Sequence, residues 1–358
     1  MPDTPPDRIL IIRPSALGDV CRSVPVLVSL KRAYPDARID WLVQDAFAPA
    51  VSAHPDLNAA IPFQRQAVAV KRWWRADARK KLHELIGSLR GARYDVVLDC
   101  QGLGRSGFFA WATRAPTRVG YANAAEFGWL GVNKRVEVSR EMHTVDRMLS
   151  LVESIGVRPV RDMRLYTPPE GQSPPDDRLS GARYAVIAPT SRWEGKRWPA
   201  DRFAELTDAL LASGTVNALA IVGGRHERDQ CAPLIARAQS DPRIVDLVGN
   251  TSIAQLMGVI ERSSLVVAND SAALHMGVGF NRPIVALFGP TRIDRVGPYQ
   301  HDADVIQPAA PPPGVSHKNT SAGLELMRRI TPKQVIEAAL SRLAEPAPPP
   351  TYPSGTRA

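Results

Sequence analysis

Short apolar runs alternate with helix-like segments along almost the whole of this chain. In the first half the strand-like runs are RILIIRP, RIDWLVQ, AAIPF, YDVVLDCQ and TRVGYA, and helical patterns cover residues 20–33, 76–89 and 143–155. After residue 181 the alternation starts again with YAVIAPT and continues through SLVVAND and PIVALFGP. Such alternation is typical of folds in which helices cover a parallel sheet. The sequence therefore predicts an α/β protein.

The stretch YTPPEGQSPPDDRLSG, residues 166–181, is dense in proline, glycine and charge and is the best candidate for a linker. We expect one open α/β domain over residues 1–165 and a second over 182–330, facing each other across a central cleft. A long loop over 307–323, a helix over 331–344 that Thr331 caps, and a disordered tail over 345–358 complete the expected organisation. Open sheets of this kind bind ligands at the carboxyl ends of their strands.

The composition narrows the class of protein and of partner. Forty-five Lys and Arg against 36 Asp and Glu give a formal net charge of +9, which favours anionic partners. Three cysteines without paired spacing exclude a disulfide framework and fit a reducing cytoplasm. No apolar run approaches the ~20 residues of a membrane helix, and the first residues lack the pattern of a signal peptide. We therefore expect a soluble, cytoplasmic protein.

The run KRWWRADARKK, residues 71–81, carries six basic residues and one acid. It is either a solvated helix face or a tryptophan-bearing surface that meets an anionic headgroup, and the residues alone do not decide between the two. Basic residues beside aromatic ones also occur in nucleic-acid-binding proteins, but the chain contains no recognised module of that kind. We expect no nucleic-acid partner.

In ILIIRPSALGDV an apolar strand ends at Arg13, a turn contains Gly18, and Asp19 follows at the start of a helix. The helix dipole favours an ionised carboxylate there. Asp19 either caps this helix or serves as a general base at a ligand-facing strand end. The glycine pattern of dinucleotide-binding folds is absent, so hydride chemistry loses its usual support.

Two motifs of the second half also follow strands. In APTSRWEGKRWP, Thr190, Ser191 and Lys196 suit a diphosphate, although a charged surface loop would look the same. In NDSAALHMGVG, Asp270 and the amides that follow it begin a helix of small residues, a site where phosphates bind.

Further residues widen the second-half site. His275 lies about one turn after Asp270 and can face the same ligand. Glu227, in GGRHERD, could accept hydrogen bonds from ribose hydroxyls or be the first-turn acid of a helix. The pair Asp302 and Asp304 lies in a polar region late in the chain, histidines do not cluster, and G-x-S-x-G is absent. Neither a metal site nor a serine hydrolase is supported, and no cofactor is expected.

Together these motifs resemble glycosyltransferase family 9, the heptosyltransferases of lipopolysaccharide core synthesis. The resemblance is strongest at RPSALGDV, DWLVQDAFA, YDVVLDCQGLGRSG, KRWP and NDSAALHMGVGFNRPIVALFGPT, and it runs in order over residues 8–340. The first-half segments look most like those of the member that adds the first heptose to Kdo. The resemblance implies GT-B architecture, in which two Rossmann-like domains face a central cleft. It also implies an inverting, metal-independent transfer from ADP-L-glycero-D-manno-heptose to a Kdo/lipid A or inner-core acceptor.

The resemblance also implies roles for particular residues. Asp19 matches the family's base, and Lys196 matches the lysine that contacts the donor diphosphate. The N-terminal domain would bind the anionic glycolipid acceptor, with peripheral contact to the inner-membrane surface, and the C-terminal domain would bind the ADP-sugar. The implied donor-binding residues are Thr190, Ser191, Lys196, Glu227, Asp270, Ser271, Ala272 and His275, and the implied acceptor-binding residues are Ser15, Lys71, Arg72 and Arg105.

Departures from the family pattern leave alternatives open. Ser271-Ala272 stands where the family often has Thr-Gly, and residues 308–327 replace a late loop that contains cysteine in some members. These differences do not change the expectation that the donor carries ADP, but they leave the identity of the sugar and of the acceptor open. The alternatives are a GT-B enzyme that uses another nucleotide sugar, either a glycan transferase or a sugar epimerase, and a non-catalytic relative that binds a nucleotide sugar.

Overall fold

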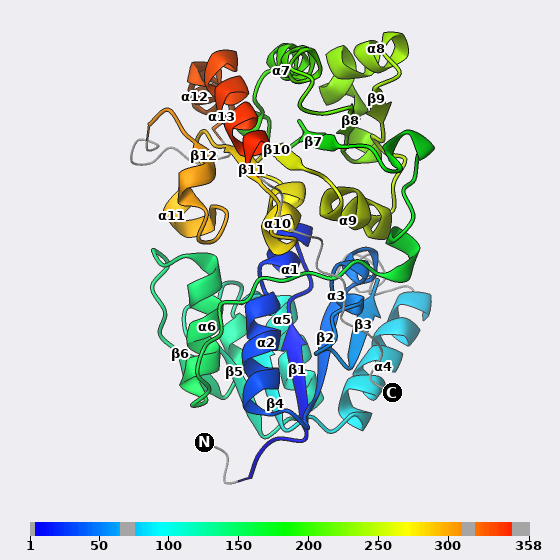
Figure 1. The fold of residues 1–358 in the computed structure, drawn as a ribbon. Coiled ribbons are helices and arrows are strands. Elements are labelled where there is room, and N and C mark those ends of the chain that lie inside the picture. Colours follow the sequence, from blue (N-terminus) through cyan, green and yellow to red (C-terminus); the bar gives the residue numbers. More distant parts are fainter. Residues whose placement is uncertain (1–3, 65–75, 310–318, 346–358) are drawn as a thin grey trace. The chain divides into compact units, whose positions relative to one another are not determined.

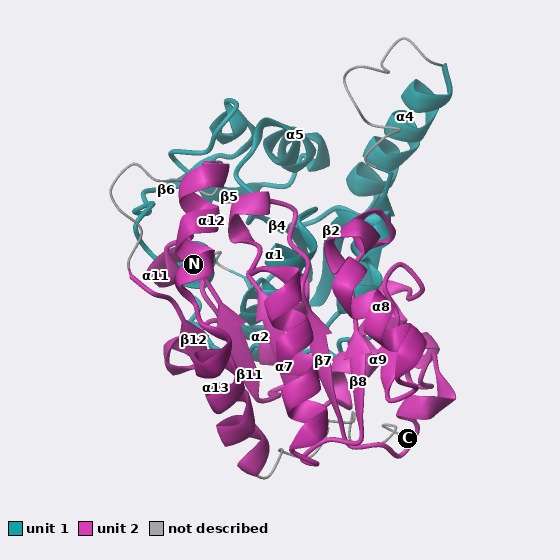
Figure 2. Ribbon diagram, turned by 90° about the horizontal axis from the view of Figure 1, so that it is seen from above, with its two compact units in different colours: residues 1–165 teal, residues 166–358 magenta. Residues whose placement is uncertain are grey.

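A computed structural model describes residues 4–64, 76–309 and 319–345 of the chain. The chain divides into two compact units, unit 1 over Met1–Leu165 and unit 2 over Tyr166–Ala358 (Figures 1 and 2). Each unit has its own six-stranded sheet, and the paired strands of both sheets are parallel. The predicted α/β class is confirmed.

The sheet of unit 1 has the order β3-β2-β1-β4-β5-β6. Its inner strands are near-continuous runs of buried apolar residues, as expected where helices cover both faces of a parallel sheet. The strands are β1 (Arg8–Ile12), β2 (Arg38–Gln44), β3 (Ala59–Phe63), β4 (Val96–Asp99), β5 (Thr117–Tyr121) and β6 (Lys134–Val136). The α-helices are α1 (Leu17–Cys21), α2 (Val24–Ala33), α3 (Pro49–Ser52), α4 (Ala76–Gly91), α5 (Gly104–Thr113) and α6 (Thr144–Ser154).

The sheet of unit 2 has the corresponding order β12-β11-β10-β7-β8-β9. Its central strands β7 and β10 are buried along their whole length. The strands are β7 (Tyr184–Ala188), β8 (Ala218–Ile221), β9 (Ile244–Asp246), β10 (Leu265–Asn269), β11 (Ile284–Leu287) and β12 (Val305–Ile306). The α-helices are α7 (Ala200–Ala212), α8 (Ala232–Ser240), α9 (Ile253–Glu261), α10 (Ala272–Gly279), α11 (Ile293–Val296), α12 (Thr320–Arg329) and α13 (Pro332–Ala344).

Two expected elements differ from the structure. The single helix expected over residues 20–33 is two helices, α1 and α2, because Pro25 near the start of α2 has no N–H to continue the hydrogen bonds of α1. The long loop expected over 307–323 is wrong at its end, since α12 begins at Thr320, where Asn319 caps it by accepting a hydrogen bond from the N–H of Ala322 (3.3 Å).

The stretch expected to be a linker contains two single 3-10 turns, η4 (Pro169–Gly171) and η5 (Asp177–Leu179). Arg262 donates a hydrogen bond to the carbonyl of Gln172 (2.8 Å), so part of this stretch packs on unit 2. The helix expected over residues 331–344 is α13, which Thr331 caps. Of the tail expected over 345–358, only residue 345 lies within the described residues. No helix in the described part of the chain is long and apolar enough to cross a membrane.

Candidate functional site

In unit 1 the chain leaves β1 and β4, which are neighbours, toward opposite sides of the sheet. Such a switch point is where open α/β sheets bind ligands. Ser15 and Asp19 follow β1, and Gln101 and α5 follow β4. The backbone N–H of Ser15 donates to the side-chain oxygen of Gln101 (3.3 Å), which joins the two loops. The predicted residues Ser15 and Asp19 therefore lie at the switch point of unit 1.

Asp19 lies in the first turn of α1, where one carboxylate oxygen accepts a hydrogen bond from the N–H of Ala16, the N-cap residue (3.3 Å). The same oxygen lies 3.1 Å from Nη2 of Arg13, and the other oxygen contacts Nη2 of Arg22. The Asp19 side chain is 26% exposed, whereas both arginine side chains are 8% exposed. Asp19 thus caps its helix and still presents part of its carboxylate to solvent.

The electrostatics of Asp19 follow from these neighbours. Burial alone would raise the pKa of Asp19, but the guanidinium groups of Arg13 and Arg22 and the hydrogen bonds to the carboxylate hold this pKa well below its usual range. The group is therefore ionised at neutral pH. It is also a weaker base than an unpaired aspartate, because its conjugate acid gives up the proton more easily.

Sequence reasoning did not find the two arginines beside Asp19. Arg22, the C-cap residue of α1, is three residues after Asp19, a spacing at which helical side chains meet, so the pair could have been found from the sequence. Arg13 also donates to the carbonyl oxygen of Cys100 (2.5 Å), beyond the end of β4, and that contact depends on strand pairing.

Asp99, the last residue of β4, is buried under this site. Its oxygens accept hydrogen bonds from the N–H groups of Gln101 and Gly102 (both 3.0 Å) and from Oγ of Ser106 (2.9 Å). Burial raises the pKa of Asp99 to about 6 despite these hydrogen bonds. The carboxylate fixes the turn between β4 and α5, and so positions Gln101 and the start of α5.

Unit 2 has an equivalent switch point between β7 and β10. Thr190 and Ser191 follow β7, and Asp270 and Ser271 follow β10. The hydroxyl of Ser191 donates to the carbonyl oxygen of Asp270 (3.3 Å). The structure therefore brings together the hydroxyl pair and the NDS motif, which are about 80 residues apart in the sequence.

Asn269, at the end of β10, holds these loops in place. Its side chain is fully buried, donates to the carbonyl oxygen of Pro189 (2.6 Å) and accepts from the N–H of Trp198 (3.1 Å). A buried amide whose hydrogen bonds are satisfied on both sides fixes one backbone arrangement. Asn269 belongs to the motif that the sequence singles out, but its holding role was not predicted. The signal was an amide at the end of a run of buried apolar residues.

Lys196 and Asp270 form an ion pair with Nζ 2.6 Å from Oδ2. Their side chains are only 14% and 11% exposed. The lysine lies in a 3-10 turn, η6 (Glu194–Lys196), between β7 and α7. The sequence assigned both residues to the same ligand but did not predict that they pair. In the pair, Lys196 is already desolvated and oriented at the end of β10.

The N-terminus of α10 begins at this ion pair. Ser271 is the N-cap residue, and within the described chain no side chain caps the helix there. The N–H groups of the first turn are therefore available to an anion. His275, on the next turn, is 3% exposed. An uncapped helix start beside an ammonium group is a suitable cradle for a diphosphate.

The remaining predicted residues are less clearly placed at these sites. Glu227 accepts a hydrogen bond from the N–H of Gly224 (2.7 Å) at the start of the 3-10 helix η7 (Arg225–Cys231), which is the arrangement of a first-turn acid. Arg105 is half-buried on α5. Lys71 and Arg72 lie outside the described residues. Within residues 4–64, 76–309 and 319–345, no group of three or more His, Cys, Asp or Glu could hold a metal ion.

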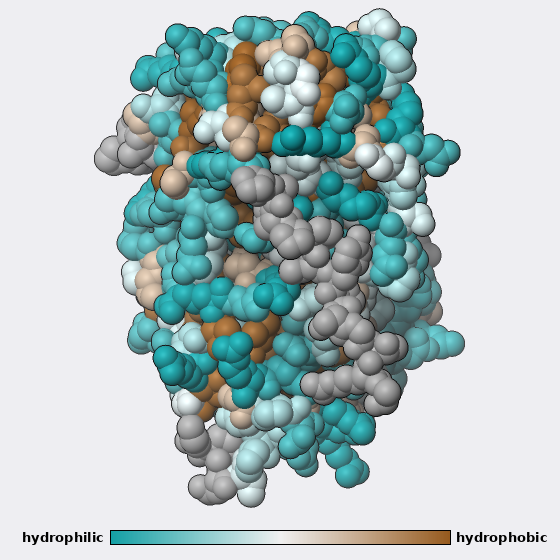
Figure 3. Space-filling model, in the orientation of Figure 1, coloured by the Kyte–Doolittle hydropathy of each residue, from teal (hydrophilic) through white to brown (hydrophobic). Residues whose placement is uncertain are grey.

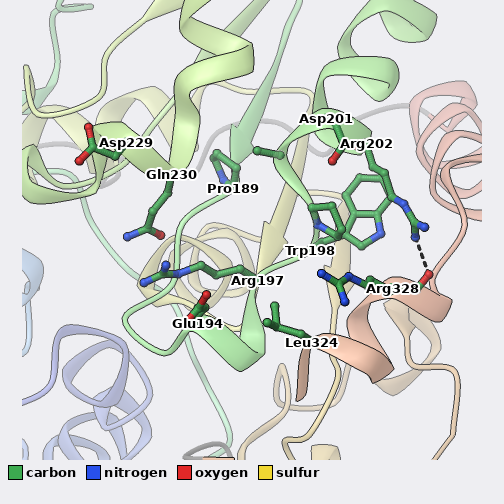
Figure 4. Close-up of a pocket in the computed structure, with 12 residues that line it drawn as sticks. Pro189, Glu194, Arg197, Trp198, Asp201, Arg202, Asp229, Gln230, Leu324 and Arg328 are labelled. Carbon is green, nitrogen blue, oxygen red and sulfur yellow. Dashed lines mark hydrogen bonds between the residues drawn. The ribbon is translucent and has the colours of Figure 1, made fainter. Parts of the chain in front are cut away.

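A pocket of about 530 Å³ lies beside the loop that carries Lys196 (Figure 4). Its lining balances three arginines against three acids, so it has no preference for an anion. Figure 4 shows the hydrogen bond that Arg202 donates to the backbone carbonyl oxygen of Arg328 (2.6 Å), so this cation already has a partner. Neither Asp270 nor Ser271 lines the pocket, and we therefore do not assign it to the site.

Comparison with known families gives one match that covers most of the chain. Residues 82–322 match glycosyltransferase family 9 (heptosyltransferase). Lipopolysaccharide heptosyltransferase 1 of Escherichia coli K12 is 26% identical over 89% of this chain and 98% of its own length. Lipopolysaccharide heptosyltransferase 2 of Salmonella typhimurium LT2 is 28% identical over 94% of this chain and 99% of its own length. These identities do not separate the two enzymes as relatives.

Solved structures agree with the sequence comparison. The E. coli ADP-heptose LPS heptosyltransferase II has a TM-score of 0.76 and 24% identity, covering 94% of this chain and 98% of that protein. The E. coli heptosyltransferase WaaC, solved with ADP, has a TM-score of 0.74 and 21% identity, covering 94% of this chain and 99% of that protein. At this identity the likeness shows the fold, and the predicted GT-B architecture of two Rossmann-like units is confirmed.

Proposed function

The chain belongs to glycosyltransferase family 9, and we propose that it moves a heptose from ADP-L-glycero-D-manno-heptose to a Kdo/lipid A or inner-core lipopolysaccharide acceptor. One observation carries the donor half of this proposal. Lys196, Asp270 and the uncapped start of α10 lie together at the switch point of unit 2, where a nucleoside diphosphate would bind. The relatives named above act in lipopolysaccharide heptose transfer or bind ADP, and this supports the choice of nucleotide and sugar.

We assign the donor to unit 2. Lys196 and the amides at the start of α10 would hold the diphosphate, with Thr190 and Ser191 beside it and His275 and Ala272 on the same helix. Glu227, after the neighbouring strand β8, is proposed to reach the ribose with the carboxylate oxygen that does not cap η7. We assign the acceptor to unit 1, with Ser15, Lys71, Arg72 and Arg105 as its contacts.

The proposed chemistry is a single displacement with inversion at the anomeric carbon. Asp19 takes the proton from the acceptor hydroxyl as that oxygen forms its bond to the anomeric carbon. The bond from this carbon to the diphosphate breaks, and its electron pair stays with ADP. Lys196 and the helix amides would stabilise the charge that develops on the leaving group, a role that many transferases give to a divalent metal.

The low pKa of Asp19 bears on the timing of this proton transfer. A carboxylate paired with two guanidinium groups is a weak base toward a neutral hydroxyl. The hydroxyl becomes far more acidic as its oxygen bonds to the anomeric carbon. We therefore expect the proton to move late, when bond formation is well advanced, so that a weak base is sufficient.

We place the protein in the cytoplasm, with peripheral contact to the inner-membrane surface through its glycolipid acceptor. The basic run expected to make this contact lies partly outside the described residues. Its described part is the start of α4, on which Lys80 is 79% exposed.

A donor screen tests the proposal. Purified protein is incubated with heptose-deficient core glycolipid and either ADP-heptose or a set of UDP-sugars, and the products are weighed by mass spectrometry. We expect addition of one heptose from the ADP donor alone. Transfer from a UDP-sugar would contradict the donor assignment. Conversion of the free donor without addition to the lipid would indicate an epimerase, and nucleotide binding without turnover a non-catalytic relative.

A further inference from the structure

Exposed apolar side chains concentrate in one part of unit 1. The large hydrophobic side chains that are exposed in the described chain all fall within residues 108–142, namely Phe108 (39%), Trp111 (54%), Phe127 (73%), Leu130 (62%) and Met142 (39%). Figure 3 shows a face on which hydrophobic areas are small and separated by hydrophilic ones. A concentration of large apolar side chains marks an interaction site more often than scattered ones do.

Four of these side chains come from two elements that are packed directly together. Phe108 and Trp111 lie three residues apart on α5, with ring centroids 6.0 Å apart. Phe127 and Leu130 belong to the turn around η3 (Gly128–Gly131). A Cβ added to Gly131 would lie 1.8 Å from the carbonyl oxygen of Gly107, so the turn touches the helix backbone. We call this surface the α5–η3 face.

The side of α5 opposite its exposed aromatic residues packs in the core of unit 1. Phe109 and Ala110 are buried in the core of unit 1, where Phe109 packs edge-on against Phe63 with centroids 5.4 Å apart. Figure 2 shows α5 at the outer edge of unit 1. The inner side of the helix therefore holds α5 on unit 1. The exposed side chains of Phe108 and Trp111 are not needed for this packing.

Basic residues flank the α5–η3 face. Arg105 lies three residues before Phe108, and Arg114 lies three residues after Trp111 at the C-cap of α5. Arg135, on β6, lies over the ring of Trp129 at 4.5 Å. Residues 104–135 contain five basic residues and a single acid, Glu126. One carboxylate oxygen of that acid already accepts a hydrogen bond from the N–H of Gly104 (3.3 Å).

We infer that the α5–η3 face docks on an anionic lipid bilayer. Exposed tryptophan and phenylalanine enter the boundary between headgroups and acyl chains, and each nearby Lys or Arg adds attraction to anionic headgroups. A fixed helix and turn lose little conformational freedom on docking. The positive rim selects a negatively charged surface over a second copy of the same face, because two copies would bring like charges together.

Vesicle sedimentation tests this inference. The full chain is mixed with vesicles of phosphatidylcholine alone or with phosphatidylglycerol added. We expect binding to the anionic vesicles that weakens with salt. The double substitution Trp111→Ser/Phe127→Asn should lower the partition coefficient about tenfold. Asparagine suits position 127 because Phe127 has a φ of 58°, which asparagine tolerates.

Matched controls keep the test specific. Arg114→Asn removes one rim charge at another left-handed position (φ 60°) and should weaken anionic binding by a smaller factor. Lys333→Gln removes one exposed charge from α13 in unit 2 and should leave binding unchanged. Equal thermal unfolding of the variants and the natural chain shows that folding is intact.

A second measurement identifies the residues at the lipid. Brominated phospholipids should quench tryptophan fluorescence of the natural chain, and Trp111→Phe should remove a substantial part of this quenching. Vesicle binding that is unchanged in the double variant would overturn the inference, as would equal binding to neutral vesicles. A concentration-dependent dimer that the double variant abolishes would assign the face to a second copy instead. Vesicle binding needs no turnover, so failure here is distinct from failure of the proposed function.

Discussion

The ion pair between Lys196 and Asp270 can be tested by replacing its two members separately and together. At 2.6 Å and an effective dielectric constant of ~20, their Coulomb attraction is about 6 kcal/mol. Desolvation of two side chains that are only 14% and 11% exposed offsets most of this attraction. The loss of one partner leaves the other charge buried and unpaired, which typically costs ~3–5 kcal/mol.

The proposed measurement is a double-mutant cycle on the free energy of unfolding in urea. Lys196→Met and Asp270→Asn should each destabilise unit 2 by about 3 kcal/mol. The double variant should cost clearly less than the sum, with a coupling energy of ~1–3 kcal/mol. Tryptophan fluorescence reports the unfolding, and one of the tryptophans, Trp198, is buried in the same unit as the ion pair.

Binding of ADP gives the same cycle a functional readout. Lys196→Met should weaken ADP binding ~10- to 100-fold in calorimetry, because a charge-assisted hydrogen bond to the diphosphate is lost. Lys333→Gln, an exposed lysine of unit 2, is the matched control and should change neither stability nor affinity. Single-variant losses below 1 kcal/mol that add without coupling would contradict a buried, desolvated ion pair. Unchanged ADP affinity in Lys196→Met would contradict the proposal that this lysine binds the diphosphate.

Three further predictions concern unit 1. Gly131→Ala should cost several kcal/mol in the free energy of unfolding, because its Cβ would meet the backbone of Gly107; a loss below 1 kcal/mol would mean that α5 and η3 separate easily. Asp99 has a folded pKa of about 6 and an ordinary value of 3.8, so it binds protons more tightly in the folded state. Its contribution to stability therefore falls as the pH rises, by about 2 kcal/mol between pH 4 and 6 and by about 3 kcal/mol over the whole transition. Asp99→Asn should remove this part of the pH dependence, measured by urea unfolding at each pH, and an unchanged profile would contradict the assigned pKa. Arg22→Gln should raise the pKa of Asp19 and move the acidic limb of the transfer rate to higher pH, whereas an unmoved limb would mean that Asp19 does not set it.

Much of the fold could be predicted because local pattern and burial agree in it. Runs such as YAVIA and LVVAN are buried along their whole length, so an apolar, β-branched sequence was a sufficient signal for the inner strands. The polar residues that follow these strands were candidate site residues for a topological reason. Neighbouring parallel strands end at the same edge, which is why Ser191 and Asp270 meet.

The features that sequence reasoning missed depend on contacts between distant segments. Arg13 is joined to the loop after β4 only through strand pairing. The contact between Gly107 and Gly131 depends on how η3 packs against α5, and no local pattern announces it. Two other misses were local, since Pro25 signals the break between α1 and α2, and Asn319 is a preferred N-cap for α12.

The most direct test of the central claim is the rate of ADP release with ADP-heptose and acceptor, in the presence of a chelator, for the natural chain and for Asp19→Asn. Asparagine keeps the size of the side chain but cannot accept the proton, and Asp19 belongs to unit 1, whereas the residues proposed to bind ADP belong to unit 2. We predict chelator-resistant turnover for the natural chain. In the variant, kcat should fall by ~10²–10⁴ while ADP affinity is unchanged. A variant within a few-fold of the natural kcat, or turnover that the chelator abolishes, would contradict a metal-independent transfer in which Asp19 is the base.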